Sequence, residues 1–95
     1  MDERIIYQEI WPSGRMIHLK LTADTFATSI YKSFLPLTTI PISAIRQVEI
    51  GRFGLSRMMT ISYYKASDTF VTASFPVRDM EMWRRVFKRL GITAN

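Results

Sequence analysis

The 95-residue chain is 47% hydrophobic and 22% charged, with a net charge of +5 and no cysteine. This length fits one domain with a buried core, and the ordinary composition favours neither a disordered chain nor a coiled coil. The lack of cysteine excludes disulfides and thiolate metal sites, and it fits a reducing compartment such as the cytoplasm.

The positive charge is the first indication of a partner. It favours anionic partners such as lipid headgroups or nucleic acid. A simpler interpretation is a solvated surface, because the thirteen Lys and Arg are distributed along the whole chain. No stretch approaches the ~20 apolar residues of a membrane span, and the charged start at residues 2–4 differs from a secretory signal. We therefore expect a cytoplasmic protein, either free or peripheral to a membrane.

The first third of the chain predicts three β-strands. Residues 4–10 are rich in β-formers, and residues 11–15 contain the proline and glycine expected of a turn. Residues 16–21 and 25–32 both alternate between apolar and polar side chains. A hairpin followed by a third strand is therefore expected. The inner face of the second strand should carry Ile17, Leu19 and Leu21, and one face of the third carries Phe26, Thr28 and Ile30.

The middle of the chain predicts four further strands. Pro36 and Pro41 bracket a short apolar run, which indicates an edge strand, since a missing N–H costs no hydrogen bond there. Residues 45–50 alternate less cleanly than their neighbours, with Ile45, Gln47 and Glu49 on one face and Arg46, Val48 and Ile50 on the other. Residues 57–65 and 69–77 alternate well. In the strand at 57–65, Met59, Ile61 and Tyr63 lie on one face. In the strand at 69–77, Val71, Ala73 and Phe75 lie on one face.

The end of the chain predicts one amphipathic helix over residues 79–90. Met80, Trp83, Phe87 and Leu90 recur at helical spacing, with Val86 at the edge of the stripe. Asp79 is expected at the N-terminus as a cap or first-turn acid, and Gly91 should end the helix. Because a single helix cannot bury its stripe alone, we expect it to cover one end of the β-structure. Glu81 is placed to pair with Arg85.

This order of elements resembles the pleckstrin-homology (PH)-like fold, and the sequence is similar to bacterial PH and GRAM-type domains. An I-P-x-x-x-I-x-x-V segment that joins the two sheets in such domains is matched by Ile40, Pro41, Ile45 and Val48. Trp83 matches a tryptophan often found in the PH helix. The resemblance implies a single domain over residues 1–95, mainly β (α+β). Its fold would be a barrel of about seven antiparallel strands in two near-orthogonal sheets, capped by the C-terminal helix.

The resemblance implies an interaction module rather than an enzyme. Lipid-binding PH domains carry an Arg-x-Arg pair after their first loop, and this chain has only Arg15, His18 and Lys20 in that region. We therefore expect a protein-binding or self-associating adaptor. The edge strand near residues 37–42 would supply backbone groups for strand addition to a protein partner or a second copy.

The alternative function is peripheral binding to anionic membrane lipids. The loop GRFGLSR, residues 51–57, holds Phe53 and Leu55 between two arginines, so apolar tips could insert while cations meet headgroups. A simpler interpretation is a hairpin turn whose Phe53 packs on its own sheet. The candidate contact residues for a membrane or partner are Arg15, Lys20, Arg52, Phe53 and Arg57.

Catalysis and cofactor binding are not expected. His18 is the only histidine, so neither a catalytic triad nor a histidine metal cluster can be assembled within one chain. Single-stranded nucleic acid is a less favoured partner, because inward alternation already accounts for two of the four aromatic residues that would stack bases. Those four residues are Tyr63, Tyr64, Phe70 and Phe75.

Overall fold

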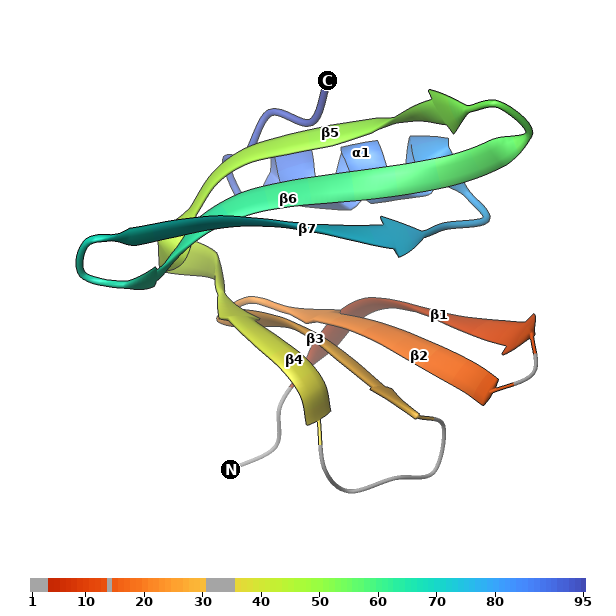
Figure 1. The fold of residues 1–95 in the computed structure, drawn as a ribbon, viewed down its shortest axis with the longest axis horizontal. Helices are drawn as coiled ribbons and strands as arrows, with labels where there is room; N and C mark the ends of the chain where they lie inside the picture. Colours follow the sequence, from red (N-terminus) through yellow and green to blue (C-terminus); the bar gives the residue numbers. More distant parts are fainter. Residues whose placement is uncertain (1–3, 14, 31–35) are drawn as a thin grey trace. The chain divides into compact units, whose positions relative to one another are not determined.

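Seven β-strands and one α-helix account for most of the described residues, which are 4–13, 15–30 and 36–95 of this computed structural model (Figure 1). The chain divides into two compact units, Met1–Ser43 and Ala44–Asn95. The first unit contains a four-stranded antiparallel sheet. The second contains a three-stranded antiparallel sheet and the helix. The mainly β class with a single C-terminal helix is therefore confirmed.

The first sheet has the strand order β1-β2-β3-β4, with β1 and β4 at its edges. Alternation on β2 and β3 is confirmed, because the buried apolar side chains follow the predicted inner faces. Ile17 is only half-buried. The fully buried apolar residues of this unit are Leu19, Leu21, Phe26 and Ile40. The strands span Ile5–Ser13 (β1), Arg15–Thr22 (β2), Thr25–Ile30 (β3) and Pro36–Pro41 (β4).

Residues 11–15, which contain Pro12 and were predicted to form a turn, are instead mostly strand. β1 continues to Ser13, and Pro12 pairs with Met16 across the hairpin. This is possible because β1 is an edge strand, where a residue without an N–H leaves no ladder bond unmade. Gly14 and the last two residues of the predicted third strand, 31–32, lie outside the described residues. The edge-strand prediction for the segment between Pro36 and Pro41 is confirmed.

The second sheet has the strand order β5-β6-β7. It is built from Ile45–Phe53 (β5), Ser56–Ala66 (β6) and Thr69–Pro76 (β7), and a 3₁₀ turn at Ile42–Ala44 precedes it. On β6, Met59 and Ile61 are buried as predicted, while Tyr63 is half-buried. On β7 the predicted inner face is half-buried and Phe70, Thr72 and Ser74 on the other face are exposed.

A β-bulge explains the irregular alternation at the start of β5. The pairing with β6 shifts between Ile45, opposite Tyr63, and Gln47, opposite Ser62. The additional residue, Arg46, changes the phase of the strand, so Ile45 is buried together with Val48 and Ile50. The predicted grouping of Ile45 with Gln47 and Glu49 is therefore wrong, because strict alternation holds only where no residue is inserted.

The helix α1, Met80–Arg89, packs against β5 and lies along one face of the second sheet (Figure 1). Trp83, Val86 and Phe87 are buried, whereas Met80 and Leu90 at the ends of the stripe are half-buried. The Asp79 carboxylate accepts a hydrogen bond from the Met82 N–H at 3.0 Å, so the predicted cap is confirmed. Gly91 has φ 80°, the left-handed conformation that ends many helices.

Candidate functional site

The hairpin tip, defined here as residues 52–57, joins β5 to β6 and is the most exposed apolar feature of the second unit. Phe53 pairs with Ser56, so only Gly54 and Leu55 form the loop. Gly54 takes φ 64°, which a two-residue hairpin loop needs at its first position. Phe53 is 66% exposed and Leu55 is fully exposed. The interpretation that Phe53 packs on its own sheet is therefore wrong.

Two arginines flank this apolar tip. Arg52 and Arg57 are direct cross-strand partners, which places two positive charges side by side on one face of the hairpin. Like charges in that arrangement are destabilising. The Arg57 guanidinium donates to the backbone carbonyl of Arg78 at 3.1 Å, so its position is partly fixed. An anion placed between these arginines would relieve their repulsion.

Three of the five predicted contact residues are therefore gathered at one place, the hairpin tip. The other two belong to the first unit. Lys20 is half-buried on β2, opposite Gln8 and Ala27. Arg15 begins β2, but its side chain lies outside the described part of the chain.

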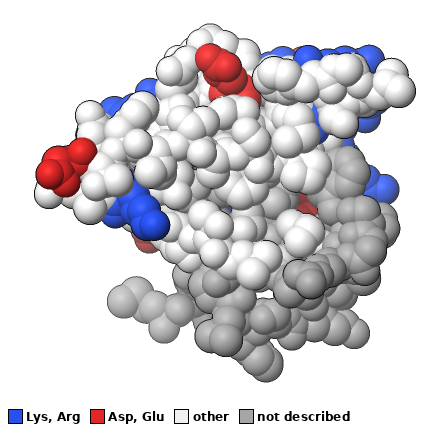
Figure 2. Space-filling view, in the orientation of Figure 1, with Lys and Arg blue, Asp and Glu red and all other residues white. Residues whose placement is uncertain are grey.

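The two units carry different charge. Residues 1–43 contain four Lys and Arg and four Asp and Glu, whereas residues 44–95 contain nine and four. The whole net charge of +5 is therefore carried by the unit that holds the hairpin tip and the helix. In Figure 2 blue atoms border an uncharged projection at the upper right, where Figure 1 places the β5–β6 hairpin. The basic residues are thus concentrated in the second unit and are not spread evenly along the chain.

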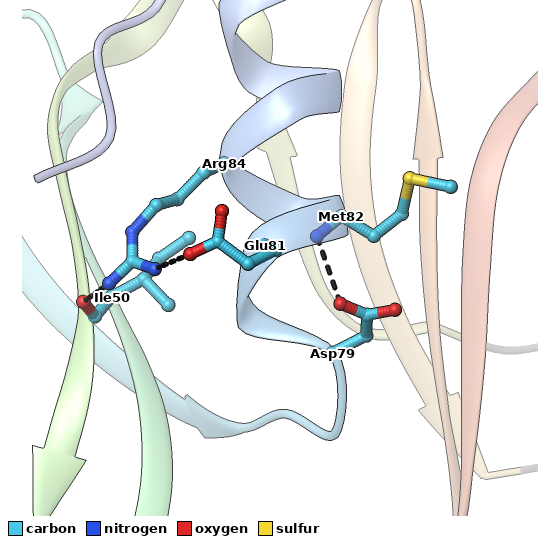
Figure 3. A network of polar contacts seen from close by, with 5 residues as sticks. All are labelled: Ile50, Asp79, Glu81, Met82 and Arg84. Atoms are coloured by element: carbon cyan, nitrogen blue, oxygen red, sulfur yellow. Dashed lines mark hydrogen bonds and ion pairs between the residues drawn. The ribbon is translucent and has the colours of Figure 1, made fainter.

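A second group of charged residues lies along α1 (Figure 3). The Arg84 guanidinium donates to the Glu81 carboxylate at 2.7 Å and to the backbone carbonyl of Ile50, also at 2.7 Å. The predicted pairing of Glu81 with Arg85 is therefore wrong. Arg84 is the better partner because the Ile50 carbonyl on β5 holds its side chain in place. No sequence signal predicts this choice, since spacings of three and four residues both suit a helix.

His18 lies on β2 with its Nε2 atom 2.7 Å from the Gln8 side-chain oxygen on β1. Burial lowers the pKa of His18 below its ordinary value of 6.5, and the positive charge of Lys20 acts in the same direction. The side chain is thus held by a strand neighbour and is biased toward its neutral form. A structural role fits this arrangement.

The four aromatic residues considered for base stacking lie on two faces of the second sheet. Tyr64 and Phe70 are exposed, with ring centroids 5.1 Å apart, and the Arg46 guanidinium lies 5.2 Å from the Tyr64 centroid. Tyr63 and Phe75 are half-buried on the opposite face. The exposed face continues as hydroxyl pairs, with Thr60 bonded to Ser74 and Ser62 to Thr72. A single four-ring platform is therefore not formed.

Neither a metal centre nor a membrane-crossing helix is found in the parts of the chain that the structure describes. No three His, Cys, Asp or Glu side chains gather there in a way that would hold a metal ion. The described helix is too short and too polar to cross a bilayer. Comparison with protein-family models, curated proteins and solved structures finds no match to this chain.

Proposed function

We propose that the chain is a non-catalytic PH-like interaction module that binds anionic membrane surfaces through its hairpin tip. The order of elements supports the PH-like part: a four-stranded antiparallel sheet, a three-stranded antiparallel sheet and a C-terminal helix follow one another along the chain. In this proposal the two sheets close into a barrel. An experimental structure with the sheets apart would contradict it.

The observation that carries the membrane proposal is the exposure of Phe53 and Leu55 between two arginines. Large apolar side chains at the end of a hairpin lose contact with water when they enter the boundary between headgroups and acyl chains. Full burial of such a side chain contributes about 1.5–3 kcal/mol. Each of Arg52 and Arg57 adds about 1 kcal/mol near an anionic surface. Together these values predict weak, reversible binding.

The proposal is tested by sedimentation with vesicles at low and at near-physiological salt. Three vesicle types are compared: neutral phosphatidylcholine, phosphatidylserine at moderate density, and a phosphoinositide at equal total charge. The test variant is Phe53→Ser with Leu55→Ser, which removes the apolar tip and keeps every charge. The matched control is Phe70→Ser, which removes an exposed aromatic residue of the same sheet outside the hairpin tip.

We expect the wild type and the Phe70→Ser variant to bind anionic vesicles at both salt concentrations, and the tip variant to lose binding at the higher one. Charge attraction is screened at the higher salt, so the remaining binding there reports the apolar contribution. Binding that follows only vesicle charge and disappears with salt in every variant would contradict the proposal.

Protein binding or self-association is the second candidate function. β4 is an edge of the first sheet, and Leu37 on it is exposed. A second copy or a partner strand would pair with its backbone. Light scattering after size-exclusion chromatography tests the self-association form, with Leu37→Lys as the disrupting variant and Lys65→Glu as a control outside this sheet. A monomer at all concentrations would exclude self-association.

A further inference from the structure

A groove between α1 and the last residues of the chain, called the helix–tail groove here, is a second basic surface in the unit Ala44–Asn95. It has a volume of ≈ 390 Å³. Small-molecule sites commonly have volumes of about 300–1,000 Å³. The groove is therefore large enough for a small anionic molecule. Its lining residues are Glu81, Arg84, Arg85, Lys88, Thr93 and Ala94.

The wall opposite the helix is held by backbone hydrogen bonds. Ala94 forms a parallel bridge with Val48, the Ile50 N–H donates to the Asn95 carbonyl at 2.6 Å, and the Asn95 N–H donates to the Val48 carbonyl at 3.0 Å. Gly91 turns the chain out of the helix, and the Ile92 N–H donates back to the Phe87 carbonyl at 3.0 Å. Thr93 is thus held between two anchored points.

The helix wall presents two cations without an acidic partner. Arg84 donates hydrogen bonds to the Glu81 carboxylate and to the Ile50 carbonyl, as Figure 3 shows. Within the described residues, Arg85 and Lys88 have exposed side chains that form neither an ion pair nor a hydrogen bond. They are three residues apart on one helix, so their like charges repel. An anion in the groove would relieve this repulsion.

We propose that the helix–tail groove binds the phosphoryl group of a small phosphorylated molecule. Arg85 offers a planar fork of N–H donors that fits phosphate oxygens in pairs, and Lys88 supplies a point charge. The Thr93 hydroxyl supplies a further donor. Arg84 acts as a positioning residue, because it keeps Glu81 away from Arg85. This site is separate from the hairpin tip and does not depend on the membrane proposal.

The experiment is a titration of the ¹⁵N-labelled full chain with inorganic phosphate and then with glycerol phosphate, followed by amide chemical shifts. Sodium chloride at matched ionic strength shows which shifts are due to salt alone. The test variant is Arg85→Gln with Lys88→Gln. The matched control is Lys65→Gln with Arg89→Gln, which removes the same charge from the same unit outside the groove. Phe53→Ser is included to separate this site from the hairpin tip.

We expect saturable shifts at residues 84–88 and 93–94, unchanged in Phe53→Ser and in the control. The test variant should bind at least about tenfold more weakly, since one lost charge-assisted hydrogen bond already accounts for that factor. Shifts that are unsaturable, that sodium chloride reproduces, or that both double variants weaken equally would overturn the proposal.

A second arm distinguishes the source of the phosphoryl group. Vesicles containing phosphatidic acid compete with glycerol phosphate, each in the wild type and in the Arg85→Gln, Lys88→Gln variant. Displacement of bound glycerol phosphate by the vesicles supports the site and shows that a lipid headgroup can supply the phosphoryl group. Retention of glycerol phosphate in their presence supports the site as one for a soluble compound.

Discussion

The units Met1–Ser43 and Ala44–Asn95 use similar secondary structure but differ in what they bury and what they expose. Among the described residues, Glu9, Thr22 and Thr28 are buried polar side chains, and all three belong to the first unit. The second unit buries apolar side chains and carries the whole net charge on its outside. The charged side chains of the second unit therefore lie outside its core. Binding residues on its surface can be substituted with little loss of folding stability.

The largest expected effect comes from the core of the second unit. Trp83 is fully buried, and its ring lies 6.1 Å from that of Phe87 between centroids. Trp83→Ala should lower the free energy of unfolding by about 3–5 kcal/mol, because it leaves a cavity. Denaturant titration followed by circular dichroism measures this change. Phe26→Ala makes the equivalent change in the first unit.

The pair of variants also tests how far the two units differ in stability. If the units unfold together, each substitution moves one common transition to lower denaturant. If they unfold separately, each moves only the transition of its own unit. A free energy of unfolding that barely changes in Trp83→Ala would contradict the helix packing described above.

A smaller effect is expected at the start of α1. Asp79→Ala removes the side chain that accepts the Met82 N–H, which should destabilise the second unit by about 1 kcal/mol. Asp79→Asn keeps an acceptor and should lose much less. Asp68→Ala removes the same charge from the β6–β7 turn and serves as the control. Equal losses in the two alanine variants would mean that charge, and not capping, is responsible.

The smallest effect concerns pH and the first unit. Because the pKa of His18 is lowered in the folded chain, the unfolded chain binds more protons between that pKa and 6.5. Stability should therefore fall as the pH is lowered through 6.5 and level off below the folded pKa. Unfolding titrations at several pH values compare the wild type with His18→Gln. The variant should lack this fall, and an unchanged profile would exclude His18 as its cause.

Periodicity predicted the helix and the strands correctly where every residue of the element follows a single helical or strand spacing. The helix stripe of Trp83 and Phe87 was identified because both lie on one face at helical spacing, and Asp79 and Gly91 mark its ends by their local chemistry. The start of β5 was misassigned because the bulge at Arg46 depends on pairing with β6. Such pairing joins residues distant in sequence, and a local pattern does not contain it.

The candidate sites were predicted only in part, for a related reason. The sequence placed Phe53 between two arginines, but its exposure depends on how tightly the hairpin turns at Gly54. The helix–tail groove was missed altogether. The groove requires Thr93 to be held beside the helix by the pairing of Ala94 with Val48 on β5. It also requires Arg84 to pair with Glu81, the carboxylate that was expected to neutralise Arg85. These are tertiary contacts that spacing along the chain does not specify.

The bridge between Val48 and Ala94 also limits how the second sheet can assemble. The edges of this sheet are β5 and β7, and along β5 the backbone of Val48 and Ile50 is already bonded to the end of the chain. Polymerisation through sheet edges needs two free edges in every copy. A further strand therefore cannot add along this part of β5. An assembly that uses only the edges of the second sheet pairs through β7 and stops at a closed pair instead of growing into a fibre.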